Sequence, residues 1–178
     1  YMENFFFFFP LSFRNPKLAL DYQQEFSKIT REKAERKEAN QSILELAYHL
    51  QVLYTDVNYP ALVVFNNLFG SSAHSKLFVQ LREREGLAYT VGSSLHVFSG
   101  MMRVYAGIDR KERLRVMKLI RQQLSDMKLG KFSDEELLLS KKVLTTDAKL
   151  SQDRVSTIME ESYNRSIYGD QVRTYSQW

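Results

Sequence analysis

The stretch that decides the fold spans residues 68–89 and reads LFGSSAHSKLFVQLREREGLAY. Just before it, Pro60 offers a helix start, because proline fits the first turn, where its missing N–H is not needed. The following run Ala61–Phe69 is apolar nearly all round, which is typical of a buried helix. We therefore predict a buried helix that ends at Gly70, with this glycine capping it in the left-handed conformation.

The rest of the stretch predicts a second helix followed by a strand. The helix begins near Ser75 and ends at Gly86, and alternation of apolar residues begins at Leu87. The inner face of this helix is expected to contain Leu77, Phe78 and Leu81.

Three segments have the alternating pattern of strands. Ser42–Leu53 alternates in part, and Leu87–Phe98 and Met101–Asp109 are separated by Ser99-Gly100, which predicts an antiparallel hairpin. In the first hairpin strand, one face is predicted to hold Leu87, Tyr89, Val91, Leu95 and Val97. In the second, the shared face holds Met102, Val104, Ala106 and Ile108. The aromatic run Phe5–Phe9 predicts one more, buried strand.

The pattern after residue 110 becomes helical. Apolar residues recur every three or four positions up to Gly130, which is expected to stop the helix, and their stripe comprises Leu114, Met117, Ile120, Leu124 and Met127. Ser133 to Glu136 forms a capping box that opens the next helix. Asp153 is expected to open a last helix whose inward residues are Val155, Ile158 and Met159. The order of elements predicts an α+β fold, with two layers: a mixed, mostly antiparallel sheet backed by helices on one face.

Composition excludes several classes of protein. The 178 residues are 44% hydrophobic and 26% charged, as in an ordinary folded protein, and contain no cysteine, which excludes disulfides and thiolate zinc sites. The net charge of +4 is too mild and too dispersed for a nucleic-acid binder. The apolar stretch around Phe5–Phe9 is far shorter than the roughly 20 residues of a membrane span, so we expect no membrane partner. The absence of cysteine is compatible with the cytosol, and we expect a cytoplasmic location.

The three histidines do not have the spacing of a zinc peptidase. Such enzymes place two histidines three or four residues apart on one helix face, whereas here they are His49, His74 and His96. The sequence also has no Gly-x-Ser-x-Gly nucleophile elbow and no phosphate-binding loop. We therefore expect no metal site in this chain and no catalytic activity of the chain alone.

The segment described first resembles a known family. Its Gly70 turn, the Ser-x-Leu-Phe of residues 75–78 and the Arg-Glu-x-x-Gly-Leu-Ala-Tyr of residues 82–89 are similar to the C-terminal half-domain of the pitrilysin/insulinase/mitochondrial processing peptidase family of zinc metallopeptidases. The resemblance covers about residues 40–165 and is strongest to bacterial members that lack the zinc motif. Further matching segments, in family order, are Gln41-Ser42, Asp56 with Tyr59–Leu62, Gly107–Asp109 and Gly130–Leu137.

The resemblance implies a role and partners. It implies that residues 1–178 are a single half-domain of a longer chain, and that four such halves form a peptide-degrading chamber. Zinc is held by a sister half-domain or a homologous subunit, and Arg82 and Tyr89 of this chain help to hold the carbonyl of the peptide substrate. A second copy of this chain, in a homo-oligomer, is a further expected partner, and the chain alone is not expected to hydrolyse peptides. The alternative is a fully inactive structural module, in which Arg82 pairs with Glu85 or Glu136 and Tyr89 packs in the sheet.

Overall fold

The computed structural model describes residues 29–39, 41–96, 100–152 and 154–169. The expected strand Phe5–Phe9, Val97 and the expected helix start at Asp153 lie outside these ranges. In the described part, strands β1 (Ser42–His49), β2 (Ala88–His96) and β3 (Met101–Ile108) form one antiparallel sheet in the order β1-β3-β2. The predicted hairpin is therefore confirmed, and β1 is shorter than expected, because it ends at His49 instead of Leu53.

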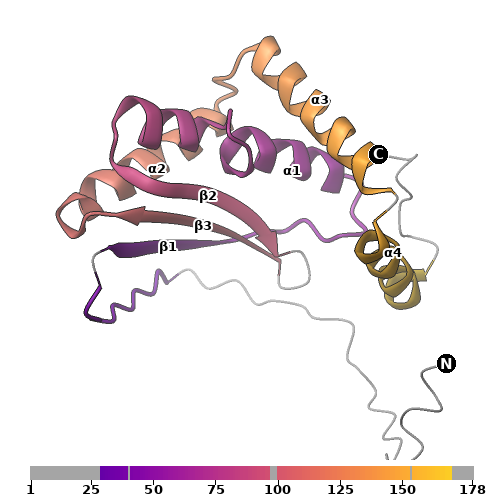
Figure 1. Ribbon diagram of the computed structural model, residues 1–178, viewed down its shortest axis with the longest axis horizontal. Helices are drawn as coiled ribbons and strands as arrows, with labels where there is room; N and C mark the ends of the chain where they lie inside the picture. Colours follow the sequence, from indigo (N-terminus) through magenta and orange to yellow (C-terminus); the bar gives the residue numbers. More distant parts are fainter. Residues whose placement is uncertain (1–28, 40, 97–99, 153, 170–178) are drawn as a thin grey trace, which may run out of the picture.

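Helices cover one face of this sheet (Figure 1). They are α1 (Tyr59–Asn66) and α2 (Arg113–Lys128). Two further helices, α3 (Asp134–Ser151) and α4 (Val155–Tyr168), follow in the chain. Figure 1 shows α3 on the far side of α1 from the sheet. The predicted α+β class, with helices behind an antiparallel sheet, is confirmed. None of the described helices is long and apolar enough to cross a membrane.

The connection between α1 and β2 consists of two wide helical turns. The first, η1 (Asn67–Ser71), continues α1, and the second, η2 (Phe78–Arg84), has π-helical geometry, as the hydrogen bond from Glu85 N to Gln80 O indicates. Gly86 ends η2 with φ 61°, as the sequence predicts. Such π turns are rare and often lie at functional sites.

Gly70 does not adopt the predicted left-handed conformation. Positive φ values occur in the described chain only at other glycines, and the helical turn passes through Gly70 into η1. The reason for glycine here is a close approach. A Cβ atom on Gly70 would lie 2.4 Å from Oγ of Ser93 in β2.

The core lies between the sheet and the helices. Its side chains from β3 are those predicted, and the fully buried set includes Phe69, Leu77, Leu81, Val104, Ala106, Ile108, Val116 and Ile120. The predicted stripe of α2 is wrong at its start, because Leu114 is 69% exposed and the buried positions are Val116, Ile120 and Met127. Residues four and seven positions apart lie on the same face of a helix, so the three buried residues share one face of α2, and Leu114 lies outside that face.

The predicted inward face of the last helix is also wrong. Val155, Ile158 and Met159 of α4 are 71%, 52% and 65% exposed. No element in the described part of the chain covers them, so the apolar pattern of α4 marks an open surface instead of a core face.

Candidate functional site

Arg82 projects from η2 away from the core. Leu77 and Leu81 anchor this segment with fully buried side chains, so the next residue, Arg82, is turned outward and is exposed. Its Cζ atom lies 5.0 Å from the centroid of the Phe78 ring, one turn earlier. A guanidinium over an aromatic face is held by a weak cation–π attraction that leaves its N–H groups available.

Glu85 and Glu136, the carboxylates that the structural alternative pairs with Arg82, are bound to other residues. Glu85 accepts hydrogen bonds from Gln80 Nε2 at 3.3 Å and from a guanidinium nitrogen of Arg115 in α2 at 2.7 Å. In the described ranges no carboxylate pairs with Arg82. The structural ion pairs with Glu85 or Glu136 are therefore not formed, and the cation of Arg82 faces solvent.

Glu136 belongs to a separate clamp at the start of α3. Both its oxygens accept hydrogen bonds from Lys76 Nζ, at 2.6 and 2.8 Å, and Oε2 also accepts one from Ser133 N at 2.8 Å. Burial by itself raises the pKa of Glu136, but these hydrogen bonds, together with the charges of Lys76 and Arg84, hold the pKa below its usual value. The sequence contains no signal for this pair, because its members are 60 residues apart.

Tyr89 is turned out of the sheet by a β-bulge. The register between β2 and β3 shifts between Ala88 and Thr90, so Ala88 is paired with Ile108 and Tyr89 is the extra residue. Tyr89 was predicted to share a face with Val91, and this is wrong: Val91 is buried, whereas Tyr89 is 58% exposed. A bulge adds one residue to a strand and thereby re-aims a side chain, which strict alternation cannot predict.

Arg82 and Tyr89 therefore both reach the surface, from neighbouring elements. The segment η2, which carries Arg82, packs against β2, which carries Tyr89, and only the turn around Gly86 separates the two elements in sequence. A guanidinium and a phenol are both hydrogen-bond donors that suit a carbonyl or a developing oxyanion. Sequence reasoning missed Gln80 and Arg115, which keep Glu85 occupied, because both contacts depend on the folded arrangement.

The side chains that the structure describes do not form a zinc site. Over the described ranges, no three His, Cys, Asp or Glu side chains lie close enough together to hold a metal. His49 and His96 end the two outer strands, each opposite Met101 of β3, and His74 lies in the exposed turn after η1. The three histidines thus remain on separate elements, and the described side chains do not provide the set of three or four ligands that zinc requires.

The described residues thus form an antiparallel sheet backed by helices, and the side chains of Arg82 and Tyr89 are exposed. The family model described as "Peptidase M16 inactive domain" matches residues 1–144. The chain belongs to this family.

Relatives of known sequence and structure are consistent with this assignment. The "probable inactive metalloprotease YmfF" of Bacillus subtilis is 34% identical over 136 residues, which are 76% of this chain and 32% of that protein. A conserved protein from Enterococcus faecalis has a crystal structure with TM-score 0.83 and 38% identity, covering 88% of this chain and 37% of its own. The peptidase M16 inactive domain from Pseudomonas fluorescens, at 22% identity and TM-score 0.60 over 77% of this chain and 36% of its own, shares the fold. The chain thus spans about a third of the length of these relatives.

Proposed function

We propose that this chain is the substrate-binding, chamber-forming half-domain of an insulinase/pitrilysin-type zinc metalloendopeptidase. Zinc is held by a sister half-domain or a partner subunit, and this chain binds the peptide. The observation that carries the proposal is the exposure of Arg82 and Tyr89. Arg82 has no carboxylate partner in the described chain, and a bulge turns Tyr89 outward. An exposed guanidinium and an exposed phenol are both donors suited to the oxygen of a peptide carbonyl.

The role of the two side chains follows from their chemistry. As a peptide bond is attacked, its carbonyl oxygen becomes negative, and donors aimed at that oxygen stabilise the transition state more than the ground state. Arg82 offers a charged, planar fork of N–H groups, and Tyr89 offers one hydroxyl. Glu85 is held by Gln80 and Arg115, so it does not compete with the substrate for Arg82.

The test is turnover of a peptide by the assembly of this chain with its zinc-bearing half. Removing one donor of this kind typically lowers kcat by roughly 10²–10³-fold. We expect this loss for Tyr89→Phe, which deletes one oxygen and keeps the ring, and for Arg82→Ala. The matched controls are Arg84→Ala on the same turn and Tyr163→Phe on α4, which should retain kcat.

The alternative of a purely structural module predicts a different result. The description of the relative YmfF as inactive favours that alternative for at least one related protein. If Tyr89→Phe and Arg82→Ala both keep near-full kcat in an assembly whose zinc content is verified, these side chains do not bind the reacting carbonyl. The half-domain then serves only as part of the scaffold.

A further inference from the structure

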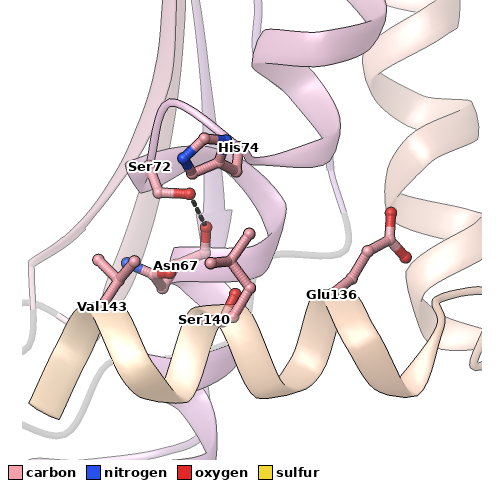
Figure 2. A pocket seen from close by; sticks show the side chains of 7 residues that line it. Asn67, Ser72, His74, Glu136, Ser140 and Val143 are labelled. Carbon is pink, nitrogen blue, oxygen red and sulfur yellow. Dashed lines mark hydrogen bonds between the residues drawn. The ribbon is translucent and has the colours of Figure 1, made fainter.

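A small notch with a mostly apolar lining lies between α3 and the turn that follows η1 (Figure 2). The space available to the centre of a water molecule in it is about 20 Å³. One water needs roughly 10–15 Å³ of such space, so the notch suits one water and excludes a metabolite. Its walls are formed by side chains of η1, of the turn and of α3, chiefly Asn67, Ser72, His74, Leu139, Ser140 and Val143.

Asn67 brings a buried acceptor without a donor into this wall. The residue is only 5% exposed, and no donor of the described residues reaches its side-chain oxygen Oδ1. Its backbone oxygen is already used by Ser72 Oγ, which donates to it at 3.1 Å, as the dashed line in Figure 2 shows. A buried acceptor almost always receives a hydrogen bond from a protein group or from an ordered water, so we expect a donor at this oxygen.

Ser140 supplies a second polar group from the opposite side. It lies on α3, is 5% exposed, and its hydroxyl forms no hydrogen bond with any residue that the structure describes. Figure 2 shows Ser140 on α3 and Asn67 on the neighbouring helical turn, both beside the notch. A hydroxyl can donate or accept, so it can bond a water in either orientation.

The electrostatics of the notch favour a neutral occupant. Glu136 at its edge is already paired with Lys76, at 2.6 and 2.8 Å, so the carboxylate does not call for a further cation. Apolar side chains of Leu139 and Val143 form the rest of the α3 wall. A site of this size with one free acceptor, one hydroxyl and no unpaired charge matches water.

We infer that one ordered water binds in this notch, donates a hydrogen bond to Asn67 Oδ1 and forms a second with the Ser140 hydroxyl. The water links the turn η1 to α3, two elements that form no direct side-chain hydrogen bond at this point. It stabilises the packing of α3 against the segment that leads into η2. This inference does not depend on the proposed function.

A double-mutant cycle on the full chain tests the link. Asn67→Leu has a similar shape but cannot bind the water, and Ser140→Ala removes only the hydroxyl. We expect each to lower Tm by about 2–4 °C, and the double variant to lower it by less than their sum, since both remove the same bridge. Ser71→Ala, at an exposed serine of the same turn, is the matched control and should leave Tm unchanged.

Two results would overturn the inference. The first is a rise in Tm for Asn67→Leu with no coupling to Ser140→Ala, since removing an unsatisfied polar group stabilises a core. The second is a high-resolution crystal structure in which Asn67 is hydrogen-bonded to a protein donor and no water lies within about 3.2 Å of its oxygen. A water in that position, bonded to both side chains, would support the inference even if Asn67→Leu fails to fold.

Discussion

The missing side chain of Gly70 sets how closely η1 approaches β2. At this contact Ser93 is buried and its hydroxyl donates to Asn66 Oδ1 at 2.7 Å, which ties the strand to the end of α1. A Cβ at Gly70 would meet Oγ, Cβ and the backbone N of Ser93 at 2.4, 2.8 and 2.9 Å. Because one of these atoms belongs to the backbone, a rotamer change of Ser93 cannot relieve the clash.

Gly70→Ala should therefore destabilise the protein, although alanine is the better helix former. Overpacking a well-filled core typically costs about 1–3 kcal/mol, and we expect a loss of this size in the free energy of unfolding. Denaturant unfolding measures it, with Ser71→Ala, an exposed neighbour, as the control. An unchanged or raised midpoint for Gly70→Ala would show that β2 and η1 separate without penalty.

Among the elements, α3 has a well-defined N-terminus that its own sequence specifies. Ser133 and Glu136 form the predicted capping box, in which Ser133 Oγ accepts from Glu136 N at 3.1 Å and Glu136 accepts from Ser133 N at 2.8 Å. The structure adds Lys76, whose side chain is only 22% exposed and whose ammonium group binds the same carboxylate. One side chain thus both begins the helix and attaches it to the segment preceding η2.

This clamp predicts a loss of stability in acid. The pKa of Glu136 is lower in the folded protein than its ordinary value, so its contribution is present above the ordinary pKa and is lost as the pH falls through the folded pKa. The free energy of unfolding should therefore fall below about pH 4–5, and protonation of Glu136 should account for part of this loss. Glu136→Gln should remove that part of the pH dependence and reduce the free energy of unfolding at pH 7 by about 1 kcal/mol, since partial exposure screens the pair.

Glu135→Gln is the control for the clamp, because Glu135 is exposed and occupies the preceding position in the first turn of α3. Unfolding should be followed by denaturant titration between pH 3 and pH 7. Parallel curves for wild type and Glu136→Gln over this range would contradict the role given to the carboxylate.

At the scale of the whole molecule, α4 leaves an apolar stripe open. Four of its exposed side chains recur at the spacing of one helix face: Val155, Ile158, Met159 and Tyr163. Such a stripe is buried against another surface in most folded proteins. No other described element covers this stripe, which supports the proposed place of the half-domain beside a sister half.

We predict that the isolated chain self-associates or binds apolar dyes. Light scattering across a concentration series and dye fluorescence measure this. Ile158→Glu on the stripe should reduce both signals, whereas Ser156→Glu, an exposed polar position of the same helix, should change neither. A chain that stays monomeric at high concentration and binds no dye would contradict the prediction.

Local patterns were sufficient to predict much of this protein. The strands β2 and β3, the capping box at Ser133, and the helix stops at Gly86 and Gly130 were predicted correctly, because each depends on neighbours within a few residues. The α+β class and the family follow from the same segments, and residues 82–89 also single out Arg82 and Tyr89. The spacing of apolar residues and the backbone preferences of single residue types can both be read from the order of residues, without knowledge of the fold.

The tertiary structure decided the rest, wherever a residue depends on atoms far away in the chain. Gly70 is needed for the approach of Ser93 instead of for its own φ, and a one-residue bulge turns Tyr89 out of the sheet. Glu85 binds Arg115 and Glu136 binds Lys76, so neither carboxylate neutralises Arg82. These outcomes depend on register, on distances between packed elements and on competition among charges, and those quantities exist only after the chain has folded.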